Sequence, residues 1–279
     1  MESETAEPPA GSAVEGHSPV AEGLARLLRV LTYNVRRCLG ADGRLAPERV
    51  AAVIAACRAD VVALQELDVG RARSGGIDQA DVIAGHLGMR AHFHPAMRVR
   101  EELYGDAILT ALPSRLVRAE ALPGRDGCEP RGALWVAIAA GDTEIQIVTT
   151  HLGLDRRERR AQAEALLGPA FLGDPDCRDP VVLLGDFNAL PGSRVHRRLA
   201  ARLPDAQRTR SWTRPTFPAR LPLLRIDHVF VSRSIAVREV RTLGGGLARI
   251  ASDHLPLVAD LDLAPALGPR ISVPREEPA

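Results

Sequence analysis

Lysine is absent from this chain of 279 residues, and all 36 of its basic residues are arginine. This bias is typical of a GC-rich genome, so clusters of arginine carry less information about function here than usual. An excess of charge of one sign is also lacking, because 36 basic and 35 acidic residues give a formal net charge of +1. No global positive field would draw the chain onto nucleic acid, which disfavours a duplex-DNA partner.

Cysteine is scarce as well. Cys38, Cys57, Cys128 and Cys177 are widely spaced, with no C-x-x-C pair and no clustering with histidine of the kind that binds zinc. We interpret them as isolated thiols of a protein in a reducing cytoplasm. No basic region followed by a long apolar run begins the chain, so no signal peptide is expected. No stretch approaches the length of a membrane span, and the expected location is the cytoplasm.

The remaining composition is that of an ordinary globular protein, with 46% hydrophobic and 25% charged residues. Residues 1–22 are rich in Glu, Ala, Pro, Gly and Ser without periodicity, which predicts a disordered leader. Residues 265–279 have a similar composition and predict a flexible tail. Between them, residues 23–264 show no internal repeat and predict a single domain, with a monomer as the expected state.

Short β-rich runs and helical stretches share this domain. Many strands with few helices, outside strict βαβ alternation, favour an α+β sheet sandwich over a doubly wound sheet. The expected strands are 29–34, 61–65, 107–112, 134–139, 145–150, 181–185, 226–231, 236–241 and 255–261. The expected helices are 47–57, 79–87, 156–171 and 193–201.

Polar residues that can bind a metal or a phosphate recur at the ends of these strands. A side chain at a strand end is held by rigid backbone and can face a cleft shared with its neighbours, as a catalytic site requires. Each alone is more simply a turn or capping residue, but their joint occurrence favours a site. The residues with this placement are Asn34, Glu66, His151, Asp186, Asp227, Asp253 and His254.

With Asn188 added, this set holds three aspartates, one glutamate, two asparagines and two histidines, and no cysteine. Hard oxygen ligands with few nitrogens suit Mg²⁺ or Mn²⁺ rather than a structural zinc ion. Glu66 is the natural primary ligand. A cation bound there would neutralise charge on a phosphoryl oxygen during cleavage of a phosphate ester.

The segment Leu183 to Asn188 adds a D-x-N pattern directly after a strand. Both polar side chains can point to the same side, so the Asp186 carboxylate can orient or deprotonate water while the Asn188 amide donates to a developing phosphorane oxygen. A serine nucleophile is disfavoured, because the chain has no G-x-S-x-G elbow. The sequence therefore predicts a metal-dependent phosphoesterase.

A series of ordered motifs carries a family resemblance. They are TYNV at 32–35, LQE at 64–66, YGDAIL at 104–109, TTHL at 149–152, GDFN at 185–188, RIDH at 225–228 and SDHLP at 252–256. In this order the chain resembles the endonuclease/exonuclease/phosphatase superfamily, which includes deoxyribonuclease I, and in particular its small bacterial members. The resemblance implies two packed mixed β-sheets flanked by helices, a four-layer sandwich with the site at one end.

The resemblance also implies roles for single residues. Glu66 would bind the metal, Asn34 would lie beside it and Asp253 would also contact it. His254, paired with Asp227, would contact the scissile phosphate.

His151 would contact the same phosphate, with Asp186 and Asn188 acting as reasoned above. Asn34, Asp106 and Arg73 are expected to contact substrate. Asp106 departs from the family pattern, in which asparagine is expected, and a carboxylate there would repel a phosphate unless a metal or an arginine offsets it.

The motifs leave the substrate open. A phosphodiester or phosphomonoester of a lipid or a small molecule is favoured, and a DNA or RNA nuclease of the same family is the alternative. A catalytically inactive binding protein on this fold is the alternative from another class, since fold does not fix function. Trp212 and Phe217, in a proline-rich loop before Asp227, are candidates to shape the rim of a substrate site.

Overall fold

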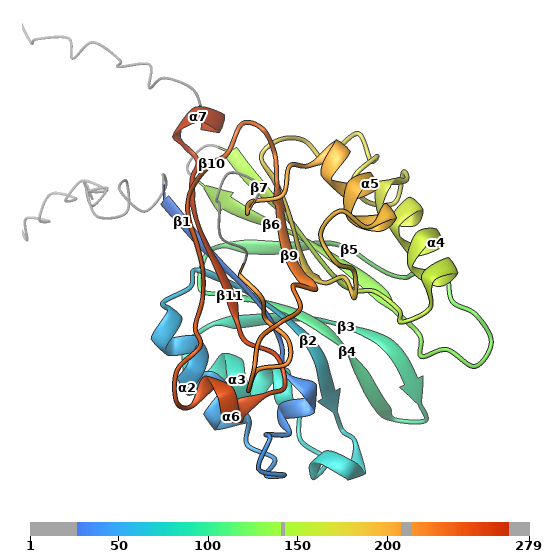
Figure 1. Cartoon of the computed structure of the whole chain (residues 1–279), viewed down its shortest axis with the longest axis vertical. Coiled ribbons are helices and arrows are strands. Elements are labelled where there is room, and N and C mark those ends of the chain that lie inside the picture. The colour runs from blue at the N-terminus through green and yellow to red at the C-terminus, as the bar shows by residue number, and fades with distance from the viewer. Residues whose placement is uncertain (1–26, 141–142, 208–213, 268–279) are drawn as a thin grey trace, which may run out of the picture.

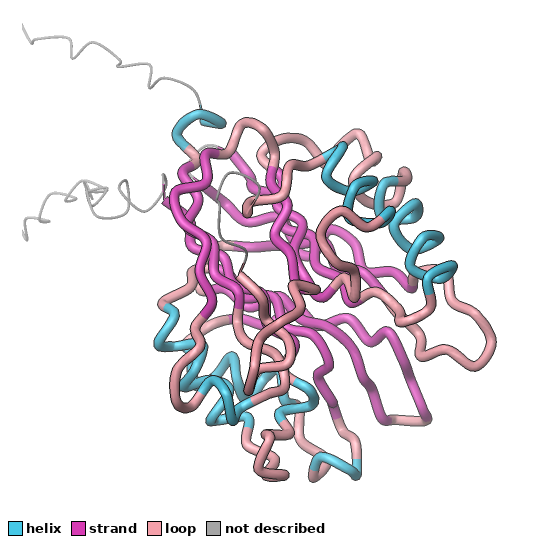
Figure 2. The backbone as a smooth tube through the Cα atoms, viewed as in Figure 1, coloured by secondary structure: helices cyan, strands magenta, loops and turns pink. Residues whose placement is uncertain are grey.

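The computed structural model describes residues 27–140, 143–207 and 214–267. They form an α+β fold in which two mixed β-sheets pack face to face and helices cover both outer faces (Figures 1 and 2). The predicted four-layer sandwich is confirmed. The expected leader, residue 212 and residues 268–279 of the expected tail lie outside the described residues.

The first sheet has six strands in the order β10-β11-β1-β2-β4-β3. Strands β1 and β2 are parallel, and the other neighbours are antiparallel. Strand β1 is buried on both faces, which explains why its sequence is a nearly continuous apolar run rather than an alternating one. The strands are β1 (Leu27–Asn34), β2 (Val61–Val69), β3 (Arg90–Val99), β4 (Glu102–Thr110), β10 (Ala236–Thr242) and β11 (Leu257–Asp262).

The second sheet has five strands in the order β5-β6-β7-β8-β9. Strands β7 and β8 are parallel, so their carboxyl ends meet at one edge, and β9 runs back from that edge. This topology brings the end of two strands and the start of a third together. The strands are β5 (Ser114–Ala121), β6 (Gly132–Ala140), β7 (Thr143–His151), β8 (Val181–Asp186) and β9 (Asp227–Val231).

Helices α2 (Pro47–Cys57) and α3 (Gln79–Leu87), with the short α6 (Ala248–Ala251), cover the six-stranded sheet (Figure 1). Helices α4 (Arg156–Leu167) and α5 (Arg194–Arg202) cover the five-stranded sheet, and the short α7 spans Ala264–Leu267. The residues at the starts of two helices explain where they begin. Pro47 is the first residue of α2, and the Asp155 carboxylate caps α4 by accepting from two backbone N–H groups. None of the helices in the described ranges is long and apolar enough to span a membrane.

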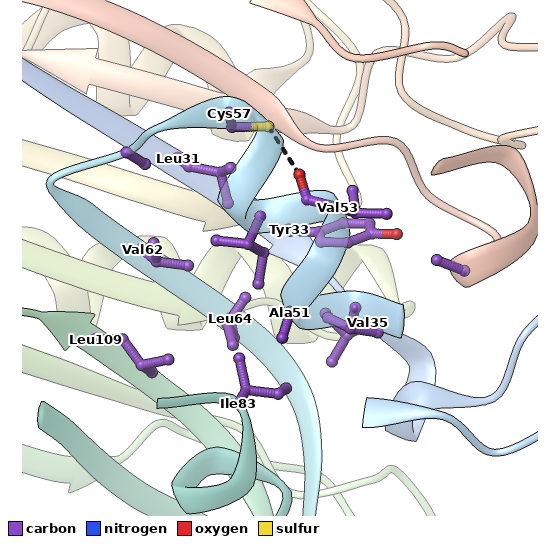
Figure 3. Close-up of a cluster of buried hydrophobic side chains, with 14 of the residues drawn as sticks. Leu31, Tyr33, Val35, Ala51, Val53, Cys57, Val62, Leu64, Ile83 and Leu109 are labelled. Atoms are coloured by element: carbon purple, nitrogen blue, oxygen red, sulfur yellow. Dashed lines mark hydrogen bonds between the residues drawn. The ribbon is translucent and has the colours of Figure 1, made fainter. Parts of the chain in front are cut away.

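Three buried clusters fill the spaces between the four layers. Figure 3 shows one of them, where Leu31 and Tyr33 of β1 pack with residues of α2 and with Ile83 of α3. Cys57 belongs to this cluster, and its thiol donates to the Val53 carbonyl at 3.4 Å. All four cysteines are free, and three of them are buried, which agrees with their interpretation as isolated thiols.

Two strands were not predicted from the sequence. Strands β3 and β5 each lie at the edge of a sheet and are largely half-exposed, so their sequences lack the apolar runs of central strands. Strand β3 also contains Pro95, which stands at a shift in its register with β4. The predicted helix 156–171 was too long, because α4 ends at Leu167 before Gly168. The predicted strand 107–112 is instead Glu102–Thr110.

Candidate active site

Three polar residues lie side by side across the edge of the five-stranded sheet. His151 at the end of β7 pairs with Asp186 at the end of β8, which in turn pairs with Asp227 at the start of β9. All three are buried. Gly185 permits this approach: it has φ of +153°, and a Cβ atom there would lie 2.0 Å from the Thr150 carbonyl oxygen.

His254 joins this row from the chain segment before β11. Its Nδ1 donates to Asp227 Oδ2 at 3.0 Å, and its Nε2 lies 3.7 Å from Asp186 Oδ2. Burial opposes charge on the ring, but Asp227 and Asp186 outweigh it and raise the pKa of His254 to about 10. Burial and Asp227 raise the pKa of Asp186 to about 7, against the effect of His254. The ring is therefore a buried cation between two carboxyl groups at neutral pH.

The six-stranded sheet contributes Asn34 and Glu66 to the same place. The Asn34 amide donates to Glu66 Oε1 at 2.9 Å and to Asp186 Oδ2 at 3.1 Å, which links the two sheets. Glu66 has φ of +62°, and β2 carries an extra residue opposite β4 between Leu64 and Leu67. This bulge turns the Glu66 side chain toward Asn34.

Asn188, the second polar residue of the D-x-N pattern, lies beside His151. Its backbone N–H donates to Asp186 Oδ1 at 2.9 Å, and its side-chain amide donates to the Leu152 carbonyl at 2.9 Å. The same amide nitrogen is 3.2 Å from Nε2 of His151. Burial, with Arg131 and His254, holds the pKa of His151 well below its usual value, so this ring is neutral and able to accept a hydrogen bond.

Asp106 on β4 is buried near these groups. Burial, with smaller effects from the charges of Glu66 and Asp186, raises its pKa to about 7, while Arg131 and the Glu66 backbone N–H act to lower it. Arg131 is buried, forms an ion pair with Glu129, and its Nε has no partner within the described part of the chain. Arg131 is thus an arginine that can offset the charge of Asp106, and it was not predicted from the sequence.

The position of Arg131 explains why it was missed. It directly precedes β6, which is antiparallel to β7, so it stands at the start of a strand rather than at an end. Because antiparallel strands run in opposite directions, the start of one strand lies beside the end of its neighbour. Residues at such starts are overlooked when only the carboxyl ends of strands are considered. The abundance of arginine in this chain also removed the usual signal of an unexpected basic residue.

The oxygen donors around Asn34 suit a hard divalent cation. Across the described ranges no basic side chain forms an ion pair with Glu66, which leaves its charge available to a metal. Asp253 adjoins the same residue, because the Ser252 hydroxyl donates to the Asn34 carbonyl at 2.8 Å. Asp253 also lies 3.5 Å from the guanidinium of Arg36. Of the predicted ligands, Glu66 and Asp253 offer carboxylate oxygens, as Mg²⁺ and Mn²⁺ prefer. The Asn34 side-chain oxygen already accepts from the Arg36 backbone N–H at 3.0 Å, and its NH₂ group faces Glu66.

A second group with metal-like spacing is Asp186, Asp227 and His254, whose ligand atoms lie within 4.8 Å of one another. Both ring nitrogens of His254 already face these two carboxyl groups. Neither ring nitrogen is therefore free in this arrangement, and the carboxylate of Glu66 is the better candidate to hold a metal.

Behind the site, His228 supports the loop that carries Asn188. Its Nε2 donates to the Ala189 carbonyl at 2.7 Å, although sequence reasoning gave this histidine no role. Asp205 lies behind it and accepts from His196 Nε2 at 2.8 Å and from Arg225. His196, Asp205 and His228 have metal-like spacing, but the Arg225 guanidinium already neutralises the carboxylate, so no metal is assigned there.

The remaining predicted contacts are more dispersed. Arg73 forms two hydrogen bonds to the buried Asp68, at 2.8 and 2.6 Å, and lies 5.4 Å over the Tyr104 ring. These contacts tie it to β2 and β4 rather than to the row at Asp186. The Phe217 ring packs on His254 with centroids 4.9 Å apart, as a residue of the rim would.

Known proteins resemble this chain in sequence and in fold. A model described as the Endonuclease/Exonuclease/phosphatase family matches residues 31–254. The uncharacterized protein YbhP of Escherichia coli is 32% identical over 164 residues, which are 57% of this chain. That match spans 63% of the length of the relative.

Solved structures share the fold. An endonuclease/exonuclease/phosphatase family protein of Bacteroides thetaiotaomicron superposes with a TM-score of 0.72 at 21% identity, covering 85% of this chain and 98% of that one. A mannosyl-6-phosphatase of the same organism has a TM-score of 0.68 at 20% identity, covering 84% of this chain and 99% of that one.

Proposed function

The chain belongs to the endonuclease/exonuclease/phosphatase family, and we propose that it hydrolyses a phosphoester by attack of a water that a divalent metal and Asp186 activate. The observation that carries this proposal is the junction of the two sheets. There the Asn34 amide bonds both Glu66, a candidate metal ligand, and Asp186, a candidate base, within 3.1 Å. A metal-held phosphate and a water near Asp186 would therefore be neighbours.

In the proposed reaction, Asp186 orients the water and takes its proton. Its pKa of about 7 suits a base that works near neutral pH. His254, held as a cation by Asp227, donates to a phosphoryl oxygen and stabilises the charge that develops on it. Asn188 and His151 lie on the opposite side of Asp186 and contact the same phosphate.

Glu66 and Asp253 would hold Mg²⁺ or Mn²⁺, with the predicted ligand Asn34 beside them orienting the Glu66 carboxylate through its amide. When bound, such an ion neutralises phosphate charge and acts as a Lewis acid. Arg131 adds a fixed positive charge that offsets Asp106, so that a phosphate can approach this side of the site.

For the substrate, we propose a compact phosphoester, a lipid headgroup or a small metabolite, rather than duplex DNA. Duplex-binding enzymes neutralise several phosphates along a groove, whereas the net charge of this chain is +1 and its arginines alternate with acids. The fold shared with a mannosyl-6-phosphatase is consistent with a small substrate.

The test is turnover by the purified chain with Mg²⁺ on matched substrates at one salt concentration. Suitable substrates are a sugar phosphate, an inositol phosphate, a phospholipid diester and plasmid DNA. Cleavage of a small or lipid ester with little plasmid nicking is expected. Efficient nicking without small-ester cleavage would make the protein a nuclease, and no turnover of any substrate would favour a binding protein.

A further inference from the structure

Two loops beside the candidate site expose aliphatic side chains. The loops are residues 214–225, before β9, and residues 243–252, between β10 and Asp253. Five of the eleven exposed large hydrophobic residues in the described part of the chain lie on them, which is a concentration rather than the usual scatter. We define the apolar loop surface as Leu221, Leu223, Leu224, Leu247 and Ile250, which are between 40% and 69% exposed.

The two loops form one continuous surface. Ala219 packs in the same cluster as Ala248 and Ala251 of α6, which lies beside α2 (Figure 1). Both loops also bond the backbone of Ala41. The Arg220 guanidinium donates to the Ala41 carbonyl at 3.1 Å, and the Ala41 backbone N–H donates to the Ile250 carbonyl at 2.8 Å.

The charged side chains on these two loops are all positive. Residues 214–225 and 243–252 contain no aspartate or glutamate, although the chain has 35 acidic residues. Arg214, Arg220 and Arg249 are exposed on the same loops. The two acidic side chains that residues of the first loop contact are already paired, Asp205 with Arg225 and Asp227 with His254. Exposed leucine beside unopposed arginine matches a lipid surface with anionic headgroups, where aliphatic chains insert and guanidinium groups stay at the phosphates.

The same surface continues into the candidate site. The Thr216 hydroxyl donates to Asp227, and the neighbouring Phe217 ring packs on His254. The second loop leads directly into Asp253. A bilayer that contacts these loops would therefore bring its headgroup phosphates to the residues proposed to act on a phosphoester.

We propose that the apolar loop surface binds anionic phospholipid bilayers and presents lipid headgroups to the site. This inference rests on the proposed function for the identity of the substrate, but the binding itself does not depend on catalysis. A protein partner fits less well, because protein interfaces are enriched in aromatic residues, whereas the apolar loop surface is entirely aliphatic.

The experiment is co-sedimentation of the full chain with vesicles of phosphatidylcholine plus phosphatidylglycerol, and with vesicles of phosphatidylcholine alone. The wild type is expected to bind the anionic vesicles more strongly. The double variant Leu221→Ser, Leu223→Ser should lower the partition coefficient by about tenfold or more, because two inserting side chains are lost. The matched control is Leu116→Ser with Val99→Ser, on strands β5 and β3, which are 50% and 48% exposed and outside the loops.

The control variant is expected to bind like the wild type, and melting temperatures confirm that both variants fold. Equal binding by all three proteins would overturn the proposal, as would no binding of the wild type to anionic vesicles, which would direct attention to a protein partner. Failure of the proposed function is a separate result, since it appears as no metal-dependent turnover of soluble esters, whether or not vesicles bind.

Discussion

Buried charges that offset one another define the candidate site at the scale of single residues. An unpaired charge in the interior is very unfavourable, so His254 remains charged there only because Asp227 and Asp186 lie on either side of it. Asn34 and the backbone of Asn188 then satisfy the oxygens of Asp186. The site is thus held in position before any substrate arrives, as electrostatic catalysis requires.

We expect Asp186→Asn to lower turnover by about a hundredfold or more with little change in melting temperature, because the change keeps the shape of the side chain and removes the base. Steady-state kinetics on the best substrate provide the measurement. Asp176→Asn, at an exposed turn on the outside of the molecule, is the matched control and should keep wild-type rates. Near wild-type rates in Asp186→Asn would remove this residue from the proposed mechanism.

Gly185 is expected to tolerate no side chain. Gly185→Ala would place a Cβ atom against the Thr150 carbonyl at a positive φ, and should lower the free energy of unfolding by about 2 kcal/mol or more. Urea denaturation measures the change. Gly85→Ala in α3, where a Cβ meets nothing within 4 Å, is the control and should be neutral or stabilising. Equal stabilities of the two variants would contradict this account.

Most of the residues that meet in the candidate site could be predicted from the sequence, because each is marked by the residues just before it. Asn34, Asp186 and His151 each follow an apolar run, so the chain itself marks where the strands end. Arg131 has no such mark, since it precedes its strand and its neighbours in space come from β4 and β7. The bulge that turns Glu66 is likewise invisible in sequence, because it arises from pairing with β4.

At the scale of elements, central strands were predictable and edge strands were not. Strands β1 and β8 are buried on both faces and therefore read as apolar runs. Strands β3 and β5 have one neighbour each and exposed faces, so their composition resembles that of loops. Their strand conformation comes from pairing with β4 and β6, which is information that lies elsewhere in the chain.

The buried carboxylate behind β9 provides a test at this scale. Asp205→Ala would leave the buried Arg225 without its partner, so we expect the free energy of unfolding to fall by about 3 kcal/mol or more at neutral pH. Burial opposes the charge of Asp205, but His196, His228 and Arg225 outweigh it and hold its pKa well below its usual value. This contribution is present above the unfolded pKa of about 3.9 and is lost as pH falls below it.

Urea denaturation at several pH values measures this effect. The difference in stability between the wild type and Asp205→Ala should shrink as the pH falls below about 4. Asp176→Ala serves as the control and should cost little at any pH. A difference that is the same at neutral and acid pH would show that Asp205 acts through packing rather than charge.

At the scale of the whole molecule, the site exists only where the two sheets meet. Asn34, Glu66 and Asp106 come from one sheet, and His151 and Asp186 from the other. The buried Gln65 bonds Thr32 on its own sheet and Thr149 on the facing one, each at 3.2 Å, and so helps to fix the sheets beneath the site. The order of strands that achieves this was not predicted from the sequence.

Metal dependence tests the central claim most directly. In the proposed mechanism the cation is held by oxygen ligands, neutralises the charge of the phosphate and helps to activate the attacking water. The measurement is turnover of the purified chain on its best phosphoester after exhaustive chelation, followed by titration with Mg²⁺ or Mn²⁺. We expect turnover to vanish on chelation and to return as the metal is restored, with Glu66→Gln needing more metal for the same rate. Full turnover of the chelated enzyme would contradict the account.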